Sequence, residues 1–121
     1  MILGDFNSHH TSWGSSVSNS YGYALLDILD MYNLCVLNSG SPTRLTKPGE
    51  AISAIDLSIC TPNLASSLSW STLCSSYNSD HYPIIISFPS PYHLEHMQLP
   101  FGEISKDLGQ LSILLTRRYF L

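Results

Sequence analysis

The chain has 121 residues, of which 44% are hydrophobic and 12% are charged, and its formal net charge is −4. A chain of this length is expected to form one domain or a part of one. The acidic balance argues against non-specific electrostatic binding of nucleic acid by this segment alone. Because the sequence has neither an apolar run of about 18 residues nor the regions of a secretion signal, we expect no membrane span and an intracellular location.

The three cysteines, Cys35, Cys60 and Cys74, lie far apart in the sequence. None of them forms a Cys-x-x-Cys pair, which argues against a zinc site. An odd number of cysteines without a secretion signal favours reduced, partly buried thiols. We therefore expect free thiols in this protein.

The first third of the chain is expected to contain the end of a strand, a loop and a helix. Residues 1–4 form a short apolar run that ends in glycine, and residues 7–19 are polar and rich in serine. Residues 21–32 have the i, i+3, i+4, i+7 apolar spacing of an amphipathic helix, which Ser20 can cap and Asn33 can end. The apolar positions of this helix are Leu25, Ile28, Leu29 and Tyr32.

The middle of the chain predicts two strands separated by a loop. Residues 34–38 form a short apolar segment, and residues 40–50 contain two prolines and two glycines, which break regular structure. Residues 53–60 alternate in polarity, the pattern of a strand with one buried face. Residues 61–64 predict a turn or a single helical turn with Pro62 at its first position.

Two further strands are expected before a Pro-Ser-Pro break. Residues 68–73 alternate weakly, and residues 82–88 contain three consecutive isoleucines that predict a strand buried on both faces. Together with the earlier elements they predict a mixed α/β fold in which residues 1–90 form one unit. Residues 91–121 are expected to form a separate tail. One helix is predicted in this tail from the spacing of Ile104, Leu108, Leu111 and Leu115.

Two polar residues follow the first strand. Asp5 and Asn7 lie two residues apart, so that on an extended backbone their side chains point the same way. The carboxylate can hold Mg²⁺ or orient a water molecule, and the amide can donate to a phosphate oxygen without adding negative charge. The alternative is a turn in which both side chains cap their own backbone. The residues alone leave these two interpretations about equal.

A second group of polar residues is associated with the later strands. Asp80 and His81 directly precede the strand at 82–88, and Asp56 interrupts the apolar strand at 53–60. A buried carboxylate is costly unless it is paired, and a histidine ring is a natural partner that would make a competent general base. The alternative is that Asp56 faces solvent at an edge of the sheet. With a divalent ion, these groups would supply what phosphodiester hydrolysis needs.

Other polar and aromatic residues have simpler interpretations. His9 and His10 are adjacent, so on extended backbone they point apart, and we interpret them as loop histidines. Trp13 is expected to pack rather than to stack on a base. Thr43 and Arg44 could contact a phosphate, but a solvated turn explains them equally well.

The order of these motifs resembles the endonuclease/exonuclease/phosphatase family, which includes exonuclease III-like apurinic endonucleases. The resemblance rests on three segments, Gly4-Asp5-Phe6-Asn7, Ser53-Ala54-Ile55-Asp56-Leu57 and Ser79-Asp80-His81-Tyr82-Pro83. A closer similarity is to the endonucleases of jockey-like non-LTR retrotransposons. It rests on Asp5-Phe6-Asn7-Ser8-His9-His10 with Trp13-Gly14, and on Pro42-Thr43-Arg44. Each motif alone is weak, but their order and spacing over residues 2–88 are specific.

The resemblance implies a role for each candidate residue. His81 would be the general base or the transition-state imidazole, and Asp56 would orient it. Asp5 would position the nucleophilic water beside Mg²⁺ or Mn²⁺, with Asp80 on the metal side of the site. Asn7 would hold the scissile phosphate. The implied partner is DNA, nicked where a retrotransposon inserts, which implies a nuclear location if the protein is functional.

Thr43 would be a second phosphate contact, in addition to Asn7.

The family also has an N-terminal half, which supplies a metal-binding glutamate, and the resemblance begins with the second half. We therefore expect part of a two-sheet α/β sandwich whose N-terminal half is missing, which is inactive alone and self-associates through uncovered sheet surface. The alternatives are a catalytically dead remnant or interaction fragment, and a phosphatase or phospholipase of the same family.

Overall fold

The structure is a computed structural model that describes residues 1–89, 102–107 and 110–115. The first elements are β1 (Ile2–Asp5), the 3-10 helix η1 (Thr11–Trp13), α1 (Ser20–Met31), β2 (Cys35–Val36) and β3 (Asp56–Cys60). The later elements are α2 (Pro62–Ala65), β4 (Ser69–Thr72), β5 (Ile84–Pro89), β6 (Gly102–Asp107) and β7 (Gln110–Leu115).

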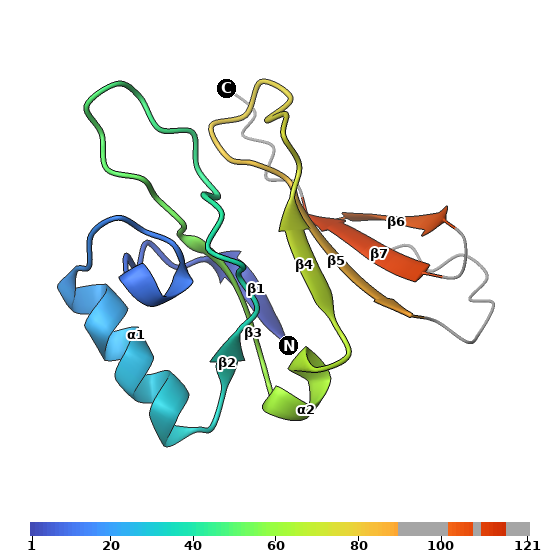
Figure 1. The fold of residues 1–121 in the computed structure, drawn as a ribbon. Coiled ribbons are helices and arrows are strands. Elements are labelled where there is room, and N and C mark those ends of the chain that lie inside the picture. The colour runs from blue at the N-terminus through green and yellow to red at the C-terminus, as the bar shows by residue number, and fades with distance from the viewer. Residues whose placement is uncertain (90–101, 108–109, 116–121) are drawn as a thin grey trace.

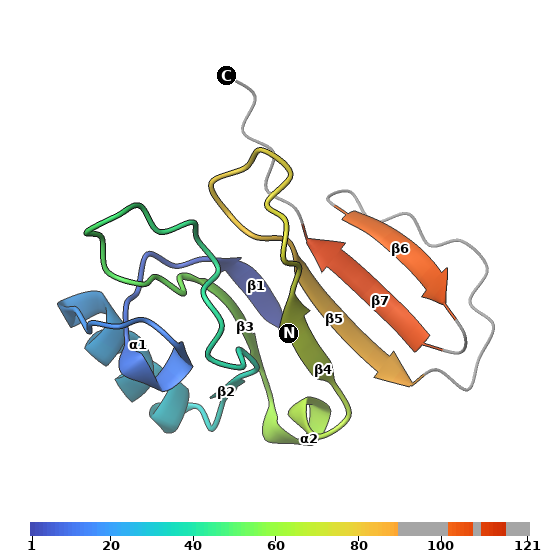
Figure 2. The same cartoon turned by 45° about the horizontal axis from the view of Figure 1, so that its top comes forward.

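These elements form the predicted mixed α/β fold with two small antiparallel sheets (Figure 1). The strand order is β1-β3-β2 in the first sheet and β4-β5-β7-β6 in the second. Helix α1 lies on one side of the first sheet and the second sheet lies on the other side (Figure 2). Strand β3 is thus the central strand of the first sheet and has neighbouring elements on both of its faces.

Helix α1 begins one residue before the predicted range of 21–32, and its N-cap is Asn19 rather than Ser20. The side-chain oxygen of Asn19 accepts a hydrogen bond of 2.8 Å from the backbone N–H of Gly22. An asparagine in extended conformation can reach this N–H, whereas Ser20 is already the first helical residue. At the other end, Asn33 has the left-handed backbone (φ 49°) that commonly stops a helix, as the sequence predicted.

Strand β3 is buried on both faces, which corrects the expectation of one buried face. Leu57 and Ile59 belong to the core cluster that also contains Trp13 and Leu29 of α1. On the other face, the buried Ser58 accepts a hydrogen bond of 3.0 Å from the indole N–H of Trp70 in β4. The polar positions of the alternating pattern are buried because the second sheet covers them.

Strand β5 is close to its predicted range, and Ile84 and Ile86 are buried while Ile85 is half-buried. The expected helix at the end of the chain is wrong, because the described residues of that segment form β6 and β7. Strand β7 pairs with the edge of β5 that β4 leaves open, with Ile113 opposite Ile86. Residues 111, 113 and 115 are also apolar at the spacing of one face of a strand, so tertiary pairing decided between two periods that the sequence allows.

Cysteines 35, 60 and 74 are free thiols. Cys35 and Cys60 are direct partners across β2 and β3, and the thiol of Cys35 donates a weak hydrogen bond to the carbonyl of Cys60 at 3.4 Å. Burial raises the pKa of the Cys60 thiol, and the neighbouring Cys35 raises it further. Cys60 therefore remains a neutral core thiol.

Strand β1 is an edge of the first sheet, because its partner within the described residues is β3 alone. Ile2 is 57% exposed on this edge. An exposed apolar side chain therefore lies beside strand backbone that pairs with β3 alone in the described part of the chain. Self-association through this surface stays a prediction. None of the helices in the described residues has the length and apolar character required to cross a lipid bilayer.

Candidate active site

Two carboxylates meet where β1 ends and β3 begins. The antiparallel register makes Asp5 the direct partner of Asp56. Just beyond this pair, the N–H of Phe6 donates to the carbonyl of Ile55 at 2.9 Å, so the register is held at this end of the ladder. Like charges directly opposite each other on a sheet are destabilising. The register therefore creates a place where a positive charge is favourable.

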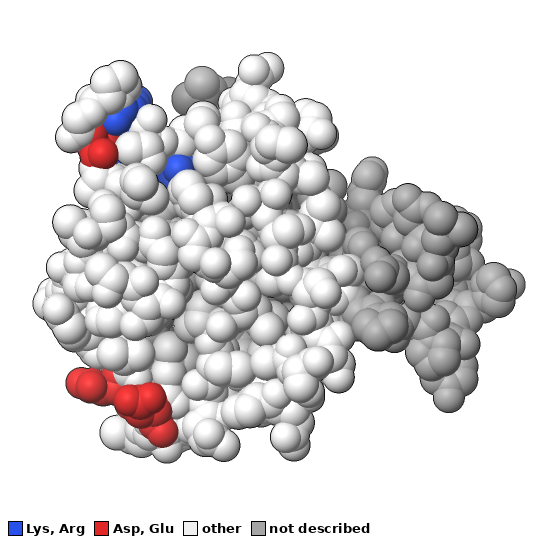
Figure 3. Space-filling view, viewed as in Figure 1, with Lys and Arg blue, Asp and Glu red and all other residues white. Residues whose placement is uncertain are grey.

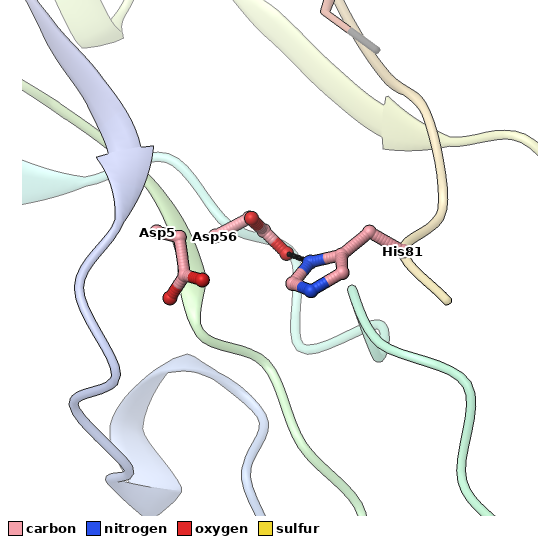
Figure 4. Close-up of side chains that lie close together, drawn as sticks. All are labelled: Asp5, Asp56 and His81. Carbon is pink, nitrogen blue, oxygen red and sulfur yellow. Dashed lines mark hydrogen bonds and ion pairs between the residues drawn. The ribbon is translucent and has the colours of Figure 1, made fainter. Parts of the chain in front are cut away.

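His81 is the partner of one of these carboxylates. It precedes β5, and an isolated antiparallel bridge joins it to Arg44. Its ring Nδ1 lies 2.6 Å from Oδ2 of Asp56 (Figure 4). The side chains are 7% exposed for His81 and 14% for Asp56, so the alternative of a solvent-facing Asp56 is wrong. Because an ionised carboxylate only accepts hydrogen bonds, Nδ1 carries the proton and donates the hydrogen bond to Asp56.

Asp5, Asp56 and His81 form one compact cluster. Each side chain offers a ligand atom, and these atoms lie within 4.8 Å of one another. The close-up shows Asp56 extending toward the imidazole, with Asp5 on its other side (Figure 4). Mg²⁺ and Mn²⁺ prefer oxygen ligands, so Asp5 fits a divalent ion, whereas Asp56 is already engaged by His81.

Asp80 does not belong to this cluster. Its carboxylate is 59% exposed, and its Oδ2 lies 3.9 Å from Nε2 of His81. An exposed carboxylate at this distance contributes little to stability. Asp80 borders the opposite side of the imidazole from Asp56, and its predicted place on the metal side stays a prediction.

Thr43 has a different position from the one predicted. It is 0% exposed, and its hydroxyl oxygen accepts hydrogen bonds of 3.0 Å from the backbone N–H groups of Ile55 and Asp56. The carbonyl of Thr43 accepts from the N–H of Tyr82 at 2.8 Å. A side chain without exposed surface cannot touch a substrate phosphate. Thr43 instead ties the start of β3 to the segment that carries His81.

Asn38 is a supporting residue that the sequence interpretation missed. Its side-chain amide donates to the carbonyl of Asp56 at 2.9 Å and accepts from the N–H of Ser58 at 3.1 Å. These two bonds continue the ladder of β3 beyond the end of the two-residue strand β2. An asparagine directly after a short apolar run was the available signal for this role.

Asn7 lies beside the cluster but not on extended backbone. Its φ of 49° is left-handed, so the assumption that Asp5 and Asn7 point the same way does not hold. The N–H of Asn7 donates to Oδ1 of Asp5 at 3.0 Å, which is the turn that the alternative interpretation described. Asn7 is nevertheless exposed at the rim of the cluster, so the turn and a phosphate contact are compatible.

The aromatic residues of the following loop pack as expected. Nδ1 of His10 accepts from the N–H of Ser12 at 3.1 Å, and its ring lies 5.0 Å from the rings of both Trp13 and Tyr23. Trp13 is buried, and its indole N–H donates to the carbonyl of Ser8 at 3.0 Å. These contacts make His10 and Trp13 structural residues that brace the loop after Asn7.

The space-filling view shows a face that carries few charges (Figure 3). Its blue atoms lie at the top left, with red atoms beside them, over the segment between β2 and β3 in Figure 1. The basic residues of that segment are Arg44 and Lys47. Arg44 is also the backbone bridge partner of His81, so this segment runs beside the candidate site.

Comparison with known proteins identifies the family of the chain. The chain matches an endonuclease/exonuclease/phosphatase family described as endonuclease-reverse transcriptase over residues 1–85. The chain belongs to this endonuclease-reverse transcriptase family. All of the cluster residues, as well as Asn7, Thr43 and Asp80, lie within the matched range.

A relative of this member of the endonuclease-reverse transcriptase family comes from Drosophila melanogaster. It is named "Probable RNA-directed DNA polymerase from transposon BS" and is 32% identical over 88 residues. The match covers 72% of the chain but 10% of the relative. The chain therefore spans about a tenth of the length of this relative. The similarity to a transposon protein supports the jockey-like retrotransposon lineage. No solved structure matches the chain.

Proposed function

We propose that this chain carries the carboxylate–histidine part of a metal-dependent site that nicks DNA during retrotransposon insertion. The observation that supports the proposal most directly is the 2.6 Å hydrogen bond between Asp56 and His81, with Asp5 in the same cluster. Family membership supports the endonuclease class. A DNA substrate would also place the active protein in the nucleus.

The imidazole of His81 is the group that moves a proton in this proposal. With Nδ1 donating to Asp56, the neutral ring keeps a lone pair on Nε2. Nε2 can take a proton from a water molecule or, when protonated, donate to a developing phosphate oxyanion. Asp56 fixes the tautomer and stabilises the charge that the ring then gains.

Asp5 would hold Mg²⁺ or Mn²⁺ through a carboxylate oxygen, and Asn7 would donate its side-chain amide to the scissile phosphate. When bound, the ion would stabilise negative charge on the phosphate and on the leaving oxygen. An amide at the rim is suited to a phosphate because it donates without adding repulsive charge. The basic residues Arg44 and Lys47 would contribute attraction for the DNA backbone.

We also propose that the chain does not cleave DNA alone. The small number of metal ligands in the cluster supports this. Asp56 and His81 are bonded to each other, so Asp5 is the cluster residue that fits the ion best. Mg²⁺ sites commonly use one or two carboxylates together with substrate phosphates. The resemblance implies that a glutamate elsewhere in the family's domain completes the site.

Paramagnetic broadening of the NMR signals by Mn²⁺ tests the metal site directly. Substoichiometric Mn²⁺ added to the 121-residue chain should selectively broaden resonances of Asp5, Asn7 and His81, and excess Mg²⁺ should restore them. Asp5→Asn should abolish the selective broadening. The acidic residues Asp27 and Asp30 of α1 provide an internal control, because they are exposed and lie outside the cluster. Broadening that is equal at the cluster and at α1 would contradict the proposed site.

The transcript sequence upstream of the Met1 codon distinguishes two hypotheses, part of an active endonuclease and a catalytically dead remnant. An in-frame segment containing a strand that ends in glutamate would restore a complete site. A stop codon directly upstream would favour the remnant.

A further inference from the structure

Asn19 is the N-cap of α1, and it also bonds to the loop that follows Asp5. Its Oδ1 accepts from the N–H of Gly22 at 2.8 Å and from the N–H of His9 at 3.1 Å. Its backbone N–H donates to the carbonyl of His9 at 3.0 Å. Its Nδ2 donates to the carbonyl of Asn7 at 3.4 Å. A capping residue needs the first of these bonds alone.

The other three bonds all hold the loop from Asn7 to His9. Asn7 occupies the left-handed backbone region, which a non-glycine residue adopts at a cost and keeps when its surroundings hold it there. Asp5 holds the N–H of Asn7, and Asn19 holds its carbonyl. The peptide groups on both sides of the Asn7 side chain are therefore fixed.

Gly22 makes this arrangement possible. A Cβ atom built on Gly22 would lie 1.9 Å from the carbonyl oxygen of His9, closer than any real contact. The first turn of α1 therefore touches the loop backbone directly. Further along the helix, Leu29 is buried in the core, so the cap of α1 is anchored to the rest of the fold.

We infer that Asn19 is a positioning residue that transmits the fixed position of α1 to Asn7 and so aims its amide at the phosphate. The part of the inference that concerns a phosphate contact rests on the proposed function. The positioning of the loop follows from the hydrogen bonds of Asn19 and does not depend on the proposed function. Asn19 touches neither the cluster nor a substrate in this account.

Residue-specific amide hydrogen exchange in the 121-residue chain tests this inference. Asn19→Ser can still cap Gly22 but is too short to reach His9 and Asn7. We expect the His9 amide to exchange at least tenfold faster in this variant, the Gly22 amide to be unchanged, and the Asn7 resonances to shift. Asn19→Asp keeps the acceptor and loses the Nδ2 donor, so it should preserve both amides and shift Asn7 alone. Asn63→Ser, in the exposed helix α2, is the matched control and should change none of these signals.

Two results would overturn the inference. Unchanged His9 exchange in Asn19→Ser would show that the bond to His9 does not hold the loop. Equal acceleration at β3 amides would show that Asn19 contributes to overall stability and not to the position of the loop. Neither result depends on the Mn²⁺ experiment, so failure of the metal site and failure of the positioning role are distinguishable.

The phosphate part of the inference has its own readout. Dimethyl phosphate is a small probe of the phosphodiester group, and its titration should shift the side-chain amide signals of Asn7 in the wild-type chain. The shift should decrease at least threefold in Asn19→Ser. An equal shift in the two proteins would overturn the link between Asn19 and phosphate contact.

Discussion

Oδ2 of Asp56 accepts a hydrogen bond of 2.6 Å from Nδ1 of His81, although the two residues lie 25 positions apart in the sequence. Asp56 is the first residue of β3, and His81 lies three residues before β5. The segment between them crosses from the first sheet to the second, so this bond joins the ends of two sheets. It is the contact on which both the local stability and the proposed chemistry depend.

We expect Asp56 and His81 to be energetically coupled. Asp56→Asn should lower the free energy of unfolding by about 2 kcal/mol, because charged hydrogen bonds contribute about 1.5–3 kcal/mol. His81→Gln should have a similar effect. Urea unfolding of both single variants and the double variant gives the coupling energy. Additivity of the two effects within about 0.4 kcal/mol would contradict a direct interaction.

Thr43 should act through its hydroxyl and not through its volume. Thr43→Val keeps the shape of the side chain but leaves the N–H groups of Ile55 and Asp56 without their acceptor. An unsatisfied buried donor costs about 1–3 kcal/mol, so the loss for two donors should be at least that large. Thr43→Ser keeps the acceptor and should lose less. A loss in Thr43→Ser as large as that in Thr43→Val, measured by urea unfolding, would show that the methyl group matters as much as the hydroxyl and would contradict the prediction.

Two glycines with left-handed backbone form a matched pair for a test of close packing. A Cβ on Gly14 would lie 2.4 Å from the carbonyl oxygen of Gly40, whereas a Cβ on Gly49 would have no atom within 4 Å. Both residues have positive φ, so alanine is strained at each position by about 1 kcal/mol. Gly14→Ala should therefore lower the melting temperature clearly more than Gly49→Ala. Similar melting temperatures would contradict the packing of η1 against the segment after β2.

Cys60 should make the chain less stable at alkaline pH. Burial favours the neutral thiol and raises its pKa in the folded state above the ordinary value of 9.0. Below pH 9.0 both states keep the proton and the stabilisation is fully present. Above it the unfolded chain loses its proton first, so the free energy of unfolding falls until the pH passes the folded pKa.

Urea unfolding between pH 8 and pH 10.5 measures this effect. Cys60→Ala should show a smaller decrease than the wild type over this range. Cys74→Ala should follow the wild type, because Cys74 is exposed. A wild-type decrease no larger than that of Cys60→Ala would contradict the assignment.

The sequence predicted the elements whose pattern is local. Helix α1 and the strands around Asp56 and Ile86 follow from spacing and alternation, and the pairing of Asp56 with a histidine follows from the cost of a buried carboxylate. The helix expected near Leu111 was wrong because its apolar spacing fits two periods. The partner that decides between them, β5, lies more than twenty residues away in the chain.

Residues that act through backbone bonds were the hardest to predict. A threonine beside an arginine in a loop suits a phosphate contact, so the sequence predicts this role for Thr43. Its burial arises from the way the segments at Ser53 and Tyr82 close around it. Asn19 carries no sequence signal beyond that of an ordinary loop asparagine, since its partners are peptide groups that any residue has. For Asn38 the signal was its place directly after a short apolar run.

The most direct test of the proposed carboxylate–histidine site is a nicking assay on supercoiled plasmid in Mg²⁺. The assay compares the 121-residue chain with its His81→Ala variant. The account predicts that Asp5, Asp56 and His81 are insufficient without further metal ligands. The amount of relaxed circle should therefore be the same for both proteins and unchanged by EDTA. Strong Mg²⁺-dependent nicking that disappears in His81→Ala would contradict the account and show that this chain is a complete nuclease.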